Sequence, residues 1–173
     1  MIIEINGKRP KIADDAFVAP TAVLIGDVTV ESGASVWWGA VLRADWNPIR
    51  VGARTSIQDN CVIHCNVANR TDIGNDVTVG HCAVIHSATI KDGAVIGINS
   101  TVLDEAVIGE GSVVSAGSVV TPKTVVEPGM LVGGVPAKPI KALSDEAKSS
   151  FEAGKRAYER LAQEYRKLDL NLE

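Results

Sequence analysis

Aromatic residues, long apolar runs and secretory features are all scarce in this sequence of 173 residues. Only 4% of the residues are aromatic although 46% are hydrophobic, so the core must consist mainly of aliphatic side chains. No apolar stretch reaches the roughly 18 residues that a membrane span requires. The N-terminus, MIIEINGKRP, lacks the pattern of a signal peptide. We therefore expect a cytoplasmic protein that does not bind membranes.

Cysteine and clustered basic charge are also scarce. Cys61, Cys65 and Cys82 are an odd number without a CxxC pair, which argues against a disulfide framework. We expect reduced thiols, with Cys61 as a small buried packing residue. The net charge is −4, and the 17 basic residues form no stripe of the kind that binds phosphate backbones. Nucleic acid is therefore not an expected partner.

What the sequence has in abundance is a six-residue repeat. The aliphatic residues that recur at this interval, with two exceptions to the spacing, are Val51, Ile57, Ile63, Ile73, Val79, Ile85, Ile90, Ile96, Val102, Ile108, Val114, Val120 and Val126. This period is typical of a parallel β-helix, in which three six-residue sides close one coil and the aliphatic residue points inward. Amphipathic stretches of ten or more residues are absent before residue 140, which argues against alternating strands and helices. The sequence predicts an all-β solenoid.

The pattern changes near residue 140. From Ser144, which is suited to cap a helix, apolar residues recur at helical spacing as far as Leu168. We predict a β-helix domain over residues 1–140, followed by a C-terminal amphipathic helix and tail over residues 141–173. The helix is expected to cover a side of the solenoid or a neighbouring subunit.

The chain contains only three histidines, and two of them fall in equivalent places. His64 follows Ile63 and His86 follows Ile85, so both are expected to point outward. The residues between them amount to three repeats with four extra residues, which makes one complete coil. The two histidines should therefore be stacked at the strand spacing of about 4.8 Å, close enough to share one zinc ion.

His81 is placed differently, two residues after Val79 and around a corner from the other two histidines. It is expected to meet them only from a neighbouring subunit, which predicts a homotrimer with sites between its chains. Three neutral ligands leave one position of a tetrahedral zinc open for water, and such water reaches a pKa of about 7. The alternative for any one of these histidines is a solvated surface residue.

Several longer segments resemble the gamma-class carbonic anhydrases, a hexapeptide-repeat family whose short members are also described as ferripyochelin-binding proteins. They are INGKRP, AFVAPTAVLIGDV, SVWWGAVLRAD, NPIRVG, SIQDNCVIH, DVTVGHCAVIH and GGVPAKPIKAL. The resemblance implies a left-handed parallel β-helix, a homotrimer, and reversible hydration of carbon dioxide to bicarbonate. It also implies that His64, His81 and His86 bind a metal, with zinc as the default and Fe²⁺ or Co²⁺ as alternatives.

The resemblance implies roles for four further polar residues. Gln58 matches the family's active-site glutamine, whose amide orients metal-bound water or bicarbonate. Arg43, Asp45 and Asp59 match an arginine–carboxylate network at subunit contacts near the site. The acidic loops that carry the proton shuttle in the family's prototypes are missing, because WNP follows Asp45 and CNVANR follows His64. We therefore expect an enzyme of low turnover.

Two other functions stay open. Hexapeptide-repeat acyltransferases use one histidine as a general base to move an acyl group from coenzyme A, and the segment GGVPAKPIKAL is similar to theirs. A general base needs one histidine, however, and not a stacked pair. A noncatalytic trimer that binds metal or supports an assembly would also account for the missing acidic loops.

The three tryptophans and Cys65 also have structural interpretations. Trp37, Trp38 and Trp46 are expected to pack at the subunit interface. Cys65 stands beside His64 and is a further candidate ligand or redox-sensitive thiol, but strand alternation predicts that its side chain faces the opposite way.

Overall fold

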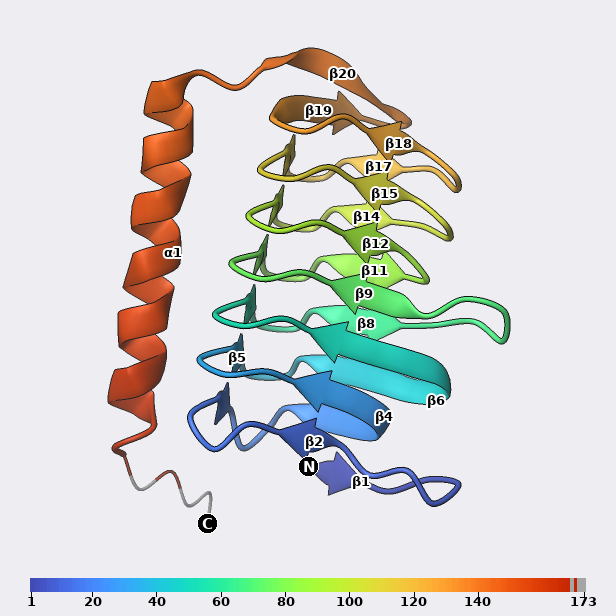
Figure 1. Ribbon diagram of the computed structural model, residues 1–173, viewed down its shortest axis with the longest axis vertical. Helices are drawn as coiled ribbons and strands as arrows, with labels where there is room; N and C mark the ends of the chain where they lie inside the picture. Colours follow the sequence, from blue (N-terminus) through green and yellow to red (C-terminus); the bar gives the residue numbers. More distant parts are fainter. Residues whose placement is uncertain (169, 171–173) are drawn as a thin grey trace.

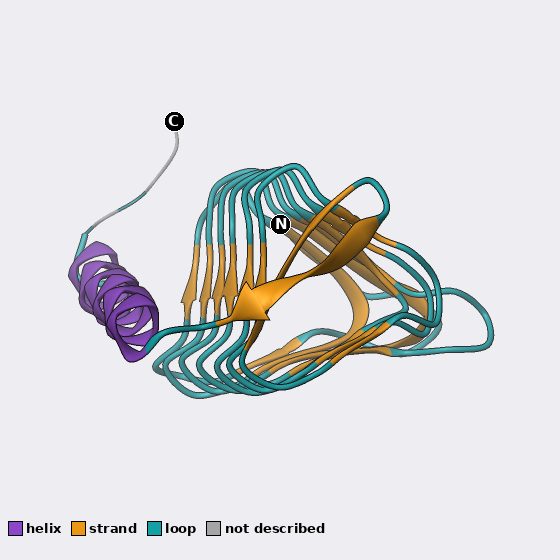
Figure 2. Cartoon of the chain, turned by 90° about the horizontal axis from the view of Figure 1, so that it is seen from above, coloured by secondary structure: helices purple, strands orange, loops and turns teal. Residues whose placement is uncertain are grey.

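Flat, three-sided coils stack into a parallel solenoid in the computed structural model, which describes residues 1–168 and 170 (Figure 1). Seen along the stack, the coils have a triangular cross-section, and a single helix stands beside one side (Figure 2). The predicted β-solenoid with a C-terminal helix is confirmed. The division into two domains stays a prediction, and residues 169 and 171–173 of the predicted tail lie outside the described residues.

One eight-stranded sheet forms the first side. Its strands in spatial order are β3 (Phe17–Val18), β5 (Ser35–Val36), β7 (Ser56–Ile57), β10 (Thr78–Val79), β13 (Val95–Ile96), β16 (Val113–Val114), β19 (Met130–Gly134) and β20 (Ala137–Ala142). All neighbours are parallel except β19 and β20, which form an antiparallel pair. β20 is an edge strand that contains Pro139, and proline at an edge discourages pairing with a further strand.

A 12-stranded sheet forms the other two sides. The second side contains β1 (Ile2–Ile3), the first halves of β4 (Val23–Val30) and β6 (Val41–Val51), β8 (Val62–His64), β11 (Val84–His86), β14 (Thr101–Val102) and β17 (Val119–Val120). The third side contains β2 (Lys11–Ile12), the second halves of β4 and β6, β9 (Thr71–Ile73), β12 (Thr89–Ile90), β15 (Val107–Ile108) and β18 (Val125–Val126). β4 and β6 run through the corner and therefore join these two sides into one sheet.

The core is a stack of aliphatic side chains, as the six-residue period predicts. Ile57, Ile63, Ile73 and Ile85 have no exposed surface. Each such residue contributes about 1.5–3 kcal/mol through burial of its side chain. Cys61 is buried as well, and its thiol donates to the carbonyl of the following coil, so its interpretation as a packing residue is confirmed. Burial raises the pKa of this thiol to about 12, which keeps it protonated.

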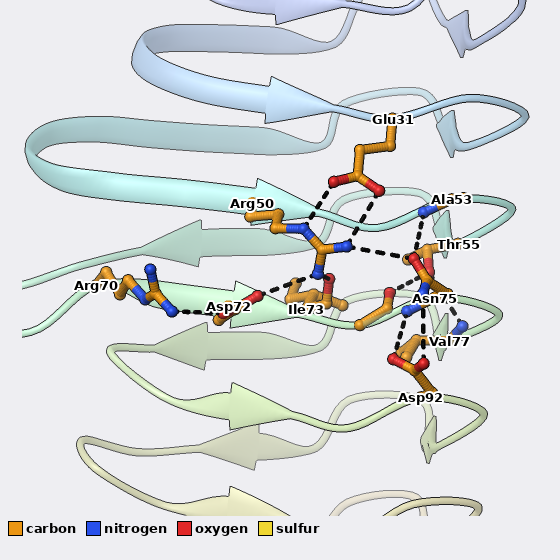
Figure 3. Close-up of polar contacts among 11 residues, drawn as sticks. Glu31, Arg50, Ala53, Thr55, Arg70, Asp72, Ile73, Asn75, Val77 and Asp92 are labelled. Carbon is orange, nitrogen blue, oxygen red and sulfur yellow. Dashed lines mark hydrogen bonds and ion pairs between the residues drawn. The ribbon is translucent and has the colours of Figure 1, made fainter.

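A polar column on the third side ties neighbouring coils together (Figure 3). Arg50 Nε lies 2.7 Å from Glu31 Oε1 in the preceding coil, and Arg50 Nη1 lies 3.3 Å from Asp72 Oδ1 in the following one. Asn75 extends the column by donating to Asp92. Because these groups are partly solvated, each pair contributes about 0.2–1 kcal/mol, and the column chiefly supports the register of the coils.

Helix α1 (Asp145–Tyr165) runs back along the first side, from the last coils toward the first (Figure 1). Its N-terminus is capped as predicted, because Ser144 Oγ accepts a hydrogen bond from the backbone N–H of Ala147 at 3.2 Å. No helix in the described part of the chain combines the length and the apolar composition that a membrane crossing needs.

An aromatic cluster joins α1 to the solenoid. Trp37 is only 2% exposed, and its ring centroid lies 5.4 Å from that of Tyr158 and 5.7 Å from that of Tyr165. Phe17 and Trp38 complete the cluster. The expectation that Trp37 packs against another subunit was therefore wrong, because the protein's own helix covers its ring. Trp38 contacts the helix but is partly exposed, and Trp46 is exposed, so their place at a subunit interface stays a prediction.

Close approach of successive coils requires glycine at Gly97. A Cβ built there would lie 2.5 Å from the backbone of Val114 and of Ala116 in the next coil. We expect Gly97→Ala to lower the free energy of unfolding by about 3 kcal/mol, since backbone atoms would have to shift. Gly154→Ala in α1 is the matched control. No atom lies within 4 Å of its added Cβ, so it should raise stability by about 0.5–1 kcal/mol.

Urea denaturation of both glycine variants measures these differences. A Gly97→Ala protein as stable as the unmodified one would show that the coils are not packed as closely as described.

Candidate metal centre

His64 and His86 form a stacked pair on the second side. They end strands β8 and β11, which are parallel neighbours, and their Cα atoms are partners in the register. Both side chains point outward because the preceding residues, Ile63 and Ile85, fill the core. The ring centroids are 5.2 Å apart and the ring planes meet at 48°. The predicted register of the two histidines is confirmed.

His64 is oriented by a carboxylate. Its Nε2 lies 3.0 Å from Asp45 Oδ1, and Arg43 donates to the other oxygen of the same carboxylate. Burial raises the pKa of Asp45, but the hydrogen bonds from His64 and Arg43 outweigh it, so the pKa lies below its ordinary value. An ionised carboxylate only accepts hydrogen bonds, so His64 Nε2 carries the proton and Nδ1 keeps a lone pair.

His86 has a carboxylate partner that we did not predict, Asp104. His86 Nδ1 lies 3.1 Å from each carboxylate oxygen of Asp104, and Asn66 donates to the same carboxylate. Burial raises the pKa of Asp104, but these two hydrogen bonds lower it further, below its ordinary value. His86 Nδ1 therefore carries the proton and Nε2 keeps a lone pair. The signal was present, since Asp104 follows His86 by 18 residues, which is one coil.

The remaining predicted residues gather at the corner between the first and second sides. His81 Nδ1 lies 2.7 Å from Asp59 Oδ2, and His81 Nε2 lies 3.2 Å from the hydroxyl of Tyr158 on α1. Burial, with a smaller effect of Asp59, raises the pKa of Tyr158, so its neutral hydroxyl donates to Nε2. Gln58 is 5% exposed at the same corner. No local pattern pointed to Tyr158, because it is 77 residues from His81.

Within one chain, the predicted site residues form two separate groups. The first group is Arg43, Asp45, His64 and His86, and the second is Gln58, Asp59 and His81. Within residues 1–168 and 170, no hydrogen bond or ion pair connects the two groups. No cluster of three or more histidine, cysteine or carboxylate side chains suited to hold a metal occurs there either. A complete three-histidine site therefore needs residues of a second chain.

The chemistry of the donors fits a metal ion. His64 and His86 each give one ring N–H to a carboxylate and present a lone pair on the other nitrogen, which is the usual arrangement of metal-binding histidines. His81 gives its Nδ1–H to Asp59, and its Nε2 lone pair is free for a metal only when the hydroxyl of Tyr158 moves away from it. Two imidazoles bound to one tetrahedral zinc have ring centroids about 5 Å apart, and the separation of the stacked pair is 5.2 Å.

Cys65 does not belong to this donor set. Its side chain is buried inside the solenoid, opposite His64, and its thiol lies 2.9 Å from the carbonyl oxygen of Asn47. Burial raises the pKa of the thiol, which disfavours the thiolate that metals bind. The predicted orientation of Cys65 is confirmed.

Several known proteins are similar to this chain over most of its length. The family model for bacterial transferase hexapeptide (six repeats) matches residues 87–122. A carbonic anhydrase from Geobacillus kaustophilus is 41% identical over 97% of this chain and 92% of its own length. Gamma carbonic anhydrase 3 of Arabidopsis thaliana mitochondria is 51% identical over 94% of this chain. This chain spans 60% to 65% of the length of three such Arabidopsis proteins.

A similar structure has also been solved. A Bacillus cereus protein, whose name as an acetyltransferase is provisional, is 39% identical and superposes with a TM-score of 0.94 over 95% of this chain and 96% of its own. The Geobacillus relative shows the family, because it is 41% identical and matches over nearly its full length. The chain belongs to the gamma-class carbonic anhydrase-like family.

Proposed function

We propose that the protein is a carbonic anhydrase that catalyses the reversible hydration of carbon dioxide to bicarbonate at a metal held between subunits. The observation that carries the proposal is the stacked pair of His64 and His86, with ring centroids 5.2 Å apart and each ring oriented by its own carboxylate. Membership of the gamma-class family supports the same activity. His81 of a neighbouring chain supplies the third ligand.

Zinc is the metal we propose, because three neutral histidines with one open position are the ligand set of many catalytic zinc sites. Bound zinc would supply a water of low pKa as the nucleophile. Fe²⁺ and Co²⁺ also accept imidazole ligands and are the alternatives. Asp45 and Asp59 hold the ring N–H groups of His64 and His81, and Arg43 fixes Asp45.

Partly exposed valines on the second side support a homotrimer. The outward positions of this side are Val23, Val41, Val62, Val84, Thr101 and Val119. Val62 is 41% exposed, and helix α1 covers the first side instead. A mainly apolar column on a surface is typical of an interaction site. A threefold arrangement would bury this column and bring His81 of one chain to His64 and His86 of the next.

The turnover that we expect depends on how the proton released during hydration leaves the site. Residues 46–48 of β6 and the loop of residues 65–70, which lie beside the stacked pair, contain neither a carboxylate nor a histidine. Gln58 can orient the bound water or bicarbonate through its amide, but an amide does not accept a proton at neutral pH. Protons therefore pass to water or buffer, and we expect low turnover that increases with buffer concentration.

Stopped-flow carbon dioxide hydration with zinc-loaded protein tests the proposal. We expect a rate above that of buffer alone, which increases with buffer concentration and is lost in His64→Ala. Metal analysis on the same samples is the control. No rate above buffer, in protein with about one metal per chain, would reject the enzyme and leave a noncatalytic metal-binding trimer.

An acyltransferase is the second candidate function. The hexapeptide family model and the name of the Bacillus cereus relative favour it. Saturable binding of acetyl-coenzyme A by metal-free protein, together with transfer of the acyl group to an amine, would replace the carbonic anhydrase proposal.

We also propose a cytoplasmic location. The Geobacillus relative, which matches over nearly its full length, is bacterial and is consistent with this location, whereas the Arabidopsis relatives are named as mitochondrial. Fractionation of cells that express the full-length protein would test it.

A further inference from the structure

Asp104 sits one coil beyond His86 and faces it with both carboxylate oxygens. Each oxygen lies 3.1 Å from His86 Nδ1, so the ring N–H is shared between them. The side chain of Asp104 is 30% exposed, which leaves much of its charge shielded from water. Its backbone carbonyl accepts from Lys123 in the next coil, so the carboxylate is carried by a regular corner of the solenoid.

Asn66 fixes the position of this carboxylate. Its side-chain N–H donates to Asp104, and its side-chain oxygen accepts from the backbone N–H groups of Ala68 and Asn69 at 2.9 and 2.8 Å. Its own backbone N–H donates to Ser87 Oγ at 2.7 Å. Both the N–H and the oxygen of the Asn66 amide therefore form hydrogen bonds, and these bonds hold the loop of residues 65–70 in place. A side chain held in this way keeps Asp104 pointing at His86.

The two stacked histidines have similar but unequal supports. Asp45, the partner of His64, also pairs with the cationic Arg43, whereas Asp104 receives only the neutral amide of Asn66. A guanidinium withdraws negative charge from its carboxylate more strongly than an amide does. Asp104 is therefore the stronger hydrogen-bond acceptor of the two. A carboxylate behind a metal-binding histidine fixes the tautomer and increases the basicity of the ring.

We propose that Asp104 is a positioning residue for His86, held in place by Asn66, and that it fixes His86 as the Nδ1–H tautomer whose Nε2 faces the metal. This inference rests on the proposed function, because it assigns the metal to the same histidines. Asp104 acts through His86 and does not touch the substrate. The loop of residues 65–70 is then the support of this carboxylate, in a place where the family's prototypes carry acidic residues.

Asp104→Asn tests the proposal, because it removes the charge and keeps the shape. We expect zinc affinity, measured by chelator competition, to fall about 10- to 100-fold. We also expect the ¹⁵N NMR spectrum of metal-free protein to change from the single Nδ1–H tautomer of His86 to a mixture. The spectrum can be assigned because the chain has only three histidines. Glu105→Gln, at the neighbouring exposed position, is the matched control and should change neither quantity.

Asn66→Ala is the second variant, and it keeps the test decisive should Asp104→Asn fail to fold. It leaves Asp104 in place but unsupported, so we expect a smaller loss of affinity and a partial change of tautomer. Unchanged zinc affinity and an unchanged His86 tautomer in these variants would overturn the inference while the proposed function stands. A wild-type protein that binds no metal would reject the proposed function, and its NMR spectrum would still decide whether Asp104 holds His86.

Discussion

Replacing His81 with alanine is expected to abolish metal binding, although His64 and His86 remain stacked in the same chain. Only two histidine ligands would be left at each site, and two imidazoles without a third hold zinc weakly. Elemental analysis of the purified protein should fall from about one metal per chain to near zero. His81 is partly exposed at a corner of the solenoid and fills no part of the aliphatic core, so the fold and its circular dichroism spectrum should be unchanged.

Mixing two inactive variants separates a site between chains from a site within one chain. His81→Ala retains the stacked pair, and the double variant His64→Ala/His86→Ala retains His81. In trimers assembled at random from equal amounts, about three quarters are mixed and each mixed trimer has one intact interface of three. About one quarter of the wild-type metal content should therefore return.

Each variant refolded alone is the control and should stay metal-free. A mixture that also stays metal-free would exclude a site shared between chains. A His81→Ala protein with full metal content would remove this histidine from the ligand set.

Replacing Trp37 with alanine should have the largest effect on stability of the single substitutions considered. The indole ring is buried beneath α1, and its N–H lies 3.0 Å from Ser35 Oγ and 2.9 Å from Ser56 Oγ. Loss of a buried tryptophan leaves a cavity and two hydroxyl groups without a partner. We expect the free energy of unfolding to fall by about 3–5 kcal/mol, as measured by urea denaturation.

Trp46→Ala is the control for this substitution. Trp46 is 55% exposed and its ring lies beside His64 and not beneath α1, so its loss should not loosen the helix. Hydrogen exchange adds a local measurement, because α1 should exchange faster in Trp37→Ala and not in Trp46→Ala. Equal effects of the two substitutions would contradict the role of Trp37 in holding the helix.

The repeat made much of the site predictable. A period of six residues determines which side chains point inward, and counting three repeats per coil put His64 and His86 at the same place in neighbouring coils, as the register shows. The same counting applied to His86 leads to Asp104. We missed Asp104 because an aspartate in a turn is usually explained by the turn itself.

Contacts made by the helix were not predictable in this way. Tyr158 reaches His81 across 77 residues, and Trp37 is covered by α1 and not by another chain. An amphipathic stripe shows that a helix will be covered on one face, but it does not identify the covering surface. Outward positions occur on all three sides of a solenoid. The side that α1 covers is determined by how the large aromatic rings of the helix and of the solenoid pack together.

The sequence by itself determined the solenoid, the inward column of aliphatic residues and the stacking of two histidines, because all three follow from a short period that every coil repeats. The tertiary structure decided which side α1 covers and that Tyr158 on this helix meets His81. These depend on side chains from distant parts of the chain that meet only when the coils and the helix are packed, and no local spacing encodes such meetings.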